Sequence, residues 1–171
     1  PDVTLPHVVT TALATVAAAD LTVARVIEPH LDARAILAEC AEPPSRPPST
    51  RWGVFAAEGP GMRLEARRDA GAWTLRGTKP WCSLAGRLTH ALVTAWSSPS
   101  ERTLYAVALQ DERVHATTDG WVARGLPDVV SSAVTFDGVP AEPVGAPGWY
   151  LERPGFAWGG IGVAAVTIGE V

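Results

Sequence analysis

The chain has 171 residues and a net charge of −4, and its basic residues are scattered along the sequence. Nucleic-acid binding is therefore not expected, because phosphate backbones attract concentrated positive charge. Apolar residues make up 47% of the sequence, which is enough for the core of one globular domain with appendages. No apolar run is long enough to cross a bilayer, and the first residues lack the pattern of a signal peptide. We expect neither a nucleic-acid nor a membrane partner.

The two cysteines, Cys40 and Cys82, form neither a disulfide framework nor a zinc-binding pattern. Unpaired thiols are typical of reducing compartments, so a cytoplasmic protein is expected. The four histidines are dispersed, with no metal-ligand spacing among them, and a metal site is not expected.

Residues 5–41 predict two helices, because alanine, valine and leucine dominate and apolar residues recur at helical spacing. Asp20 is placed to cap the second helix. Pro29 predicts a kink or a break near His30, because proline lacks the amide hydrogen and clashes with the preceding turn. The apolar side of the second helix is expected to carry Val23, Val26, Ile27, Leu31, Ala35 and Leu37.

A proline-rich segment, residues 43–50, follows the helices and cannot continue them. It predicts a linker between residues 1–42, the end of an N-terminal helical domain, and a second domain. The pattern of residues 51–148 predicts a small antiparallel β-barrel or sandwich. The strands are expected at Arg51–Ala57, Arg63–Asp69, Ala72–Arg76, His90–Trp96, Thr103–Leu109, Val114–Thr118 and Val130–Phe136.

From residue 149 the pattern changes again. Residues 149–171 are mostly small or apolar, and Pro154 suits the first turn of a helix. Such a helix needs a packing partner, so these residues are expected to begin a C-terminal helical domain that continues beyond Val171. The predicted fold class is α+β, and the isolated chain is expected to be oligomeric or poorly soluble.

The most informative segment is residues 75–83, with the sequence Leu-Arg-Gly-Thr-Lys-Pro-Trp-Cys-Ser. A polar turn at residues 69–73 leads into a strand, then a glycine–lysine corner, a tryptophan and a short hydroxyl residue. This order resembles the acyl-CoA dehydrogenases, in which the segment reads roughly G-x-K-x-W-x-T/S. Residues 125–145 add a second match in the right order, resembling the last strand of the family's middle domain. The resemblance implies the family's order of N-terminal helices, middle β domain and C-terminal helical bundle.

The resemblance also implies a flavin site. Trp81 would lie against the isoalloxazine ring of bound FAD, and the Ser83 hydroxyl would reach the reactive N5 edge of the ring. A second flavin-facing strand would comprise Phe55, Ala56, Ala57 and Glu58. In this strand alanine replaces the family's threonine, and the Gly-Ser-Asp turn that follows in the family is missing. Two other interpretations stay open: Trp81 as a tryptophan of the barrel core, and Ser83 as an ordinary turn residue.

The neighbours of Trp81 are expected to be structural. Cys82 is predicted to point to the opposite face of the strand and to be buried. Arg76 and Lys79, near the strand ends, are expected to be solvated. No residue of the chain is predicted to be catalytic: the family's glutamate base would lie beyond Val171, and neither Glu58 nor Glu170 stands at a matching position.

The function that the resemblance implies is FAD-dependent α,β-dehydrogenation of an acyl-CoA thioester. The full-length protein or a complex would perform it, with an electron-transfer acceptor as a partner and an oligomer formed through the C-terminal bundle. Two alternatives stay open. One is a non-catalytic subunit or assembly module of the same fold, and the other is a flavin-dependent monooxygenase that shares the architecture.

Overall fold

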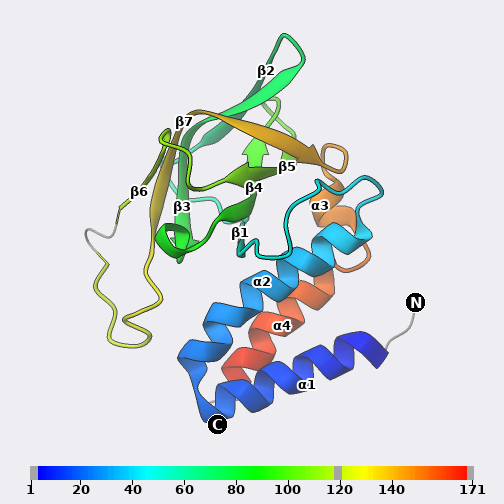
Figure 1. Ribbon diagram of the computed structural model, residues 1–171, viewed down its shortest axis with the longest axis vertical. Coiled ribbons are helices and arrows are strands. Elements are labelled where there is room, and N and C mark those ends of the chain that lie inside the picture. The colour runs from blue at the N-terminus through cyan, green and yellow to red at the C-terminus, as the bar shows by residue number, and fades with distance from the viewer. Residues whose placement is uncertain (1–3, 118–120, 169–171) are drawn as a thin grey trace.

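The computed structural model describes residues 4–117 and 121–168, so the predictions for Thr118 and Glu170 lie outside the described residues. The chain forms a β-barrel with a layer of helices beneath it (Figure 1). This is the α+β class that the sequence predicts. In the described part of the chain, no helix has both the length and the apolar character needed to span a membrane.

The helical layer is built from both ends of the chain. Helices α1, α2 and α4 pack against one another, and α2 also contacts the barrel (Figure 1). Pro154 lies just before the last helix and not in its first turn. The helices are α1 (Thr4–Ala19), α2 (Leu21–Glu39), α3 (Trp149–Glu152) and α4 (Phe156–Ile168), with a short 3₁₀ turn, η1, at Ala85–Arg87.

Helix α2 begins where the sequence predicts, because the Asp20 carboxylate accepts a 3.1 Å hydrogen bond from the Val23 amide. Of the kink or break predicted near His30, the break does not occur, since α2 runs as one helix through Pro29. Packing on both sides of the proline explains this. The N-terminal half of α2 is buried against α1 and α4, and its C-terminal half is buried against the barrel. These tertiary contacts outweigh the hydrogen bond that Pro29 removes.

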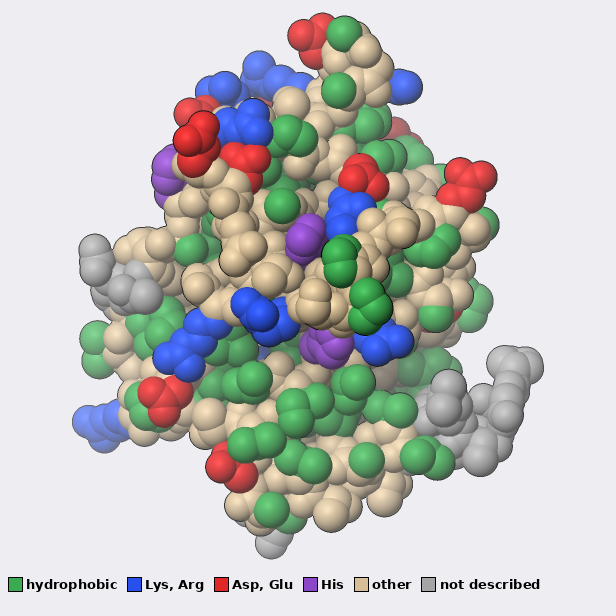
Figure 2. Space-filling model, viewed as in Figure 1, with side chains coloured by type: hydrophobic (Ala, Val, Ile, Leu, Met, Phe, Trp, Pro, Cys, Tyr) green, Lys and Arg blue, Asp and Glu red, His purple; other side chains and the backbone are tan. Residues whose placement is uncertain are grey.

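The buried side of α2 also differs from the prediction. Val23, Val26, Ile27 and Leu31 are all exposed, and hydrophobic side chains are visible over the helical part of the surface (Figure 2). The buried residues of α2 are Ala24, Glu28, Ala33 and Ile36. Small side chains allow close approach of the neighbouring elements, so tertiary packing selects a face that hydrophobicity alone does not indicate.

The barrel is a closed ring of β4, β2, β3, β7 and β5, because β5 pairs back onto β4. The remaining strands pair at the outside, β1 with β4 and β6 with β7. The strands are β1 (Trp52–Phe55), β2 (Leu64–Asp69), β3 (Ala72–Ser83), β4 (His90–Trp96), β5 (Arg102–Ala108), β6 (Val114–Ala116) and β7 (Ser131–Val144).

The prediction of a purely antiparallel sheet is wrong at one strand, β4. It pairs in parallel with β1, and a single parallel bridge joins Glu65 of β2 to Trp96 of β4. The reason is the connection: the β2–β3 hairpin separates β1 from β4, so the chain can return to β4 in the direction of β1.

Strands β3 and β7 are both longer than predicted and pair along most of their lengths. Irregularities in their register occur between Leu75 and Arg76 and between Lys79 and Cys82. Such bulges let a ladder continue past an extra residue, but they interrupt the alternation from which strands are predicted. The sequence therefore predicts a strand end at Arg76, where the structure has a bulge.

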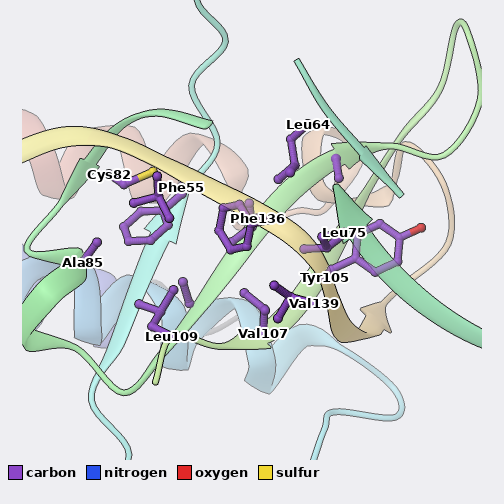
Figure 3. Close-up of a cluster of buried hydrophobic side chains, with 14 of the residues drawn as sticks. Phe55, Leu64, Leu75, Cys82, Ala85, Tyr105, Val107, Leu109, Phe136 and Val139 are labelled. Atoms are coloured by element: carbon purple, nitrogen blue, oxygen red, sulfur yellow. The ribbon is translucent and has the colours of Figure 1, made fainter. Parts of the chain in front are cut away.

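The barrel core contains apolar side chains from every strand of the ring, with Phe136 near the middle of Figure 3. A second cluster joins α2 to the outside of β4, where Leu92 lies with Ala33 and Ile36. Strand β4 is thus buried on both faces, which explains its continuous apolar sequence. The irregular connection at residues 40–51 links α2 to β1 and contains no helix, as its prolines predict.

Candidate functional site

The connection between β1 and β2 lines two pockets. The barrel–helix pocket, of about 430 Å³, lies between α2, α4 and the barrel, and its lining includes residues 54–57, Ser83, Glu28, Asp32, Arg153 and Phe156. The tryptophan pocket, of about 320 Å³, is lined by Gly59, Pro60, Met62, Pro80, Trp81, Trp121 and residues 131–133. Volumes of this size are typical of small-molecule sites.

Trp81 is displayed outward by a β-bulge. The bulge lies between Lys79 and Cys82, and Trp81 itself has a positive φ of 51°. A non-glycine residue seldom adopts this conformation, and such strain persists where the surrounding structure imposes it. As a result, Trp81 is 57% exposed while Cys82 is 1% exposed. The interpretation of Trp81 as a core residue is therefore wrong, and the prediction of a buried Cys82 is confirmed.

Cys82 is a packing residue in an inert form. Burial raises the pKa of its thiol to about 12, although Lys79 nearby acts in the opposite direction. The thiolate is the nucleophilic form of cysteine, so this thiol is unreactive at neutral pH.

The glycine of the motif has a steric role. Gly77 has a φ of +120°, and a Cβ atom there would lie 2.2 Å from the carbonyl oxygen of Arg63. The Thr78 amide donates a 3.0 Å hydrogen bond to the same oxygen. Only glycine permits this close approach of β3 to the start of β2, which sets the direction of the strand toward Trp81.

Lys79 is not solvated, contrary to the prediction. Its side chain is 1% exposed, and its ammonium group lies 2.5 Å from Glu58 Oε1 and 2.8 Å from Thr94 Oγ1. Burial lowers the pKa of Lys79, although Glu58 acts in the opposite direction. Arg76, by contrast, is exposed as predicted and pairs with Asp137 at 2.9 Å. Lys79 is buried and Arg76 is exposed because the two side chains leave β3 on opposite sides, and only one side faces the barrel interior.

Glu58 receives further partners besides Lys79. The Trp96 indole nitrogen donates to it at 3.2 Å, and Arg102 lies 3.5 Å away. Burial alone would raise the pKa of Glu58, but the hydrogen bond and charge of Lys79, aided by Trp96 and Arg102, lower it overall. Because Glu58 follows Ala57 and Lys79 precedes Trp81 by two residues, this ion pair ties together the linings of both pockets.

Two serines lie at the boundary of the pockets. Ser83 lines the barrel–helix pocket, Ser131 lines the tryptophan pocket, and their hydroxyl oxygens are 2.6 Å apart. Ser83 ends β3 and is followed by Leu84, whose φ is +61°. It is therefore both a residue before a turn and a residue of a pocket.

The structure thus divides the predicted site residues. Phe55, Ala56, Ala57 and Ser83 line the barrel–helix pocket together, Trp81 lines the tryptophan pocket, and Glu58 lies between them in the ion pair with Lys79. The link between the two sets is the Ser83–Ser131 pair.

Four charged residues of the barrel–helix pocket, Arg25, Glu28, Asp32 and Arg153, were not predicted. Arg153 is 4% exposed, lies 2.6 Å from Glu39 and 3.7 Å from Asp32, and precedes α4. Burial raises the pKa of both Asp32 and Glu28. The spacing of Glu28 and Asp32 places them on one helical face, which is a signal in the sequence. Nothing in the sequence brings Arg153, more than a hundred residues later, beside them.

Each pocket also contains a buried donor that has no acceptor among the described residues. These donors are Nε1 of Trp121, in the tryptophan pocket, and Nε of Arg153, in the barrel–helix pocket. A buried donor without a partner is costly, and a ligand with acceptor atoms would satisfy it. An exposed aromatic ring, adjacent hydroxyl groups and an unsatisfied indole nitrogen fit a flat heterocycle that carries acceptor atoms.

The sequence matches no protein-family model and none of the curated proteins. The fold, in contrast, is shared with solved structures, some of which contain FMN. TdsC from Paenibacillus sp. A11-2, a dibenzothiophene monooxygenase solved with FMN and indole, has a TM-score of 0.75 and 22% identity over 94% of this chain. KijD3, solved with FMN and a dTDP-linked amino sugar, has a TM-score of 0.74 and 20% identity over 94% of this chain.

A nitrososynthase from Micromonospora carbonacea var. africana has a TM-score of 0.71 and 22% identity over 94% of this chain. The chain covers 47%, 46% and 47% of TdsC, KijD3 and the nitrososynthase, so it spans about half the length of each. At these identities the likeness establishes the fold of the matched part.

Proposed function

We propose that the chain forms the flavin-facing part of a flavin-dependent monooxygenase. The observation that carries this proposal is the Ser83–Ser131 pair, which joins a pocket with an exposed tryptophan to a second pocket. The likeness to a monooxygenase and to FMN-bound structures supports the oxygenase alternative over the dehydrogenase. FMN replaces the expected FAD as the proposed cofactor for the same reason.

Two tryptophans of the tryptophan pocket and Ser83 at its boundary have roles in this proposal. The Trp81 ring offers a flat apolar surface for the isoalloxazine, and Trp121 Nε1 donates to an acceptor atom of the ligand. The Ser83 hydroxyl contacts the N5 edge from the boundary between the pockets. When bound, reduced flavin supplies the electrons that activate molecular oxygen.

The barrel–helix pocket is the proposed substrate site. Phe55, Ala57 and Phe156 provide apolar surface, while Asp32 and Arg153 provide polar groups. Such a combination binds a small, mostly apolar molecule and orients it by a few hydrogen bonds. The same apolar surface would limit the access of water to the reacting groups.

FAD-dependent dehydrogenation of acyl-CoA stays the second proposal, because the sequence around Trp81 and Ser83 resembles that family. It requires a carboxylate base, which the resemblance puts beyond Val171. The electron acceptor and an oligomer formed through the C-terminal bundle belong to this second proposal.

Flavin binding is tested first, by titrating the full-length protein with FMN and following tryptophan fluorescence. Trp81→Leu is expected to raise the Kd for FMN about tenfold, because the stacking surface is lost. Trp158→Leu is the matched control, since Trp158 is on α4 and lines neither pocket. An unchanged Kd in Trp81→Leu would contradict the assignment of the flavin to this pocket.

The reaction is tested with two probes. With reduced FMN, ¹⁸O₂ and indole as a probe, a monooxygenase is expected to transfer one labelled oxygen atom to the product, which mass spectrometry detects. With FAD, octanoyl-CoA and an artificial electron acceptor in the absence of oxygen, a dehydrogenase forms the enoyl-CoA. Formation of enoyl-CoA without a labelled oxygenated product would favour the dehydrogenase over the monooxygenase. Failure to bind either flavin would favour a non-catalytic module.

A further inference from the structure

One direction of the Ser83–Ser131 hydrogen bond lets both serine hydroxyl groups donate to a neighbour. The two residues face each other in the antiparallel β3–β7 ladder, with their hydroxyl oxygens 2.6 Å apart. Ser131 Oγ also lies 3.2 Å from the carbonyl oxygen of Val129, to which it donates. A carbonyl oxygen only accepts, and a hydroxyl has one proton. Both hydrogen bonds form together only when Ser131 donates to Val129 and Ser83 donates to Ser131, so this arrangement assigns the proton between the serines to Ser83.

This direction leaves Ser83 with lone pairs and no proton for a ligand. The N5 atom of an oxidised flavin is an acceptor, while in the reduced flavin it carries a hydrogen and donates. A serine with a free hydroxyl serves both forms. A serine whose proton is already committed serves only the form that donates.

We propose that Ser131 is a positioning residue that holds Ser83 as a hydrogen-bond acceptor, so that the site prefers reduced flavin to oxidised flavin. The inference rests on the proposed function, because it concerns the same flavin edge. It adds a residue and a redox preference that the resemblance does not contain.

The preference is measured as the ratio of two dissociation constants for the full-length protein, for oxidised FMN and for reduced FMN under anaerobic conditions. Ser131→Ala frees the Ser83 proton, which can then be donated to oxidised N5. The ratio of the oxidised to the reduced Kd is expected to fall roughly fivefold, the factor that corresponds to one net hydrogen bond. Most of the change is expected in tighter binding of oxidised FMN.

Matched variants separate this effect from a structural one. Ser131→Thr keeps the hydroxyl and Ser131→Val removes it at nearly the same shape, so the ratio is expected to fall only in the valine variant. Thr135→Ala is the positional control, because the Thr135 hydroxyl faces that of Thr78 at 3.2 Å on the same β3–β7 ladder and Thr135 lines neither pocket. In a Ser83→Ala background, Ser131→Ala is expected to leave the ratio unchanged.

The outcomes distinguish failure of the proposed flavin function from failure of the proposed role of Ser131. If the native protein binds neither form of FMN, the proposed function fails. If it binds FMN but Ser131→Ala and Ser131→Val keep the native ratio, only the role of Ser131 is overturned. An equal loss of affinity for both forms also overturns it, because a structural role would produce that result.

Discussion

The barrel and the helical layer differ in what each buries. The barrel core is apolar, and its buried cation, Lys79, is paired with Glu58 and hydrogen-bonded to Thr94. The helical layer buries Glu28 and Arg153 while Val26 and its neighbours stay exposed. The barrel therefore holds its buried cation in an ion pair within an apolar core, whereas the helical layer keeps charge inside and apolar surface outside.

The difference indicates where ligand-binding residues lie. The barrel contributes rigid positions, such as the bulge that displays Trp81 and the strand end that carries Ser83. The helices contribute buried charges at the other side of the barrel–helix pocket. Groups held in a stable sheet are well ordered, and buried charges that reduce stability are typical of functional sites.

The largest expected effect is in the barrel core. Phe136→Ala is expected to reduce the free energy of unfolding by about 4 kcal/mol, because it leaves a cavity in a cluster of buried side chains. Urea denaturation measures the change. The contrasting variant, Val26→Ala on the exposed side of α2, is expected to change stability by less than about 0.5 kcal/mol. A large loss in Val26→Ala would show that the helical layer depends on this surface.

The next effect concerns the buried ion pair. Lys79→Met is expected to cost about 2 kcal/mol, less than for a fully buried pair, because Glu58 is partly exposed and keeps Trp96 and Arg102. The control is Arg76→Met, which removes an exposed ion pair on the same strand and is expected to cost less than about 0.5 kcal/mol. The double variant with Glu58→Gln is expected to recover part of the loss. Equal effects of Lys79→Met and Arg76→Met would contradict a special role of the buried pair.

The smallest expected effect is on the pH dependence of stability, for the same substitution, Glu→Gln, made once in the helical layer and once beside the barrel. Burial, aided by Asp32 and opposed by Arg25, raises the pKa of Glu28 above 4.5, so its charge costs stability at neutral pH. Glu28→Gln is therefore expected to stabilise the fold at neutral pH, on the order of 0.5 kcal/mol. The gain disappears as the pH falls below 4.5, where Glu28 is protonated in both states.

Glu58→Gln is expected to act in the opposite direction. Although burial alone would raise its pKa, Lys79 and the other partners lower it below 4.5, so the charged form stabilises the fold. Its substitution destabilises the protein at neutral pH, and the difference is lost as the pH falls through the lowered pKa. Thermal unfolding measured across this range tests both signs. A change in stability of the same sign for Glu28→Gln and Glu58→Gln at neutral pH would contradict the difference between the two regions.

Much of the local structure is predictable from the sequence. Asp20 marks the start of α2, the prolines of residues 43–50 exclude a helix, and β4 appears with its observed bounds. These features depend on hydrogen bonds and backbone limits within a few residues, so a short window contains the information. The β-bulges of β3 break the alternation of side chains from which a strand is predicted. The predicted end of β3, Arg76, therefore lies several residues before its observed end at Ser83.

The amino-acid pattern is enough to predict the class of fold, the order of its elements and the segment that carries Trp81 and Ser83. Three features follow from the tertiary structure alone: the burial of Lys79, the parallel pairing of β1 and β4, and the position of Arg153 beside Asp32. They cannot be predicted because the residues involved lie far apart along the chain. Burial and ion pairing depend on which surfaces meet, and the partners of these residues lie far away in the sequence. The same holds for Ser83, whose hydroxyl partner, Ser131, belongs to another strand.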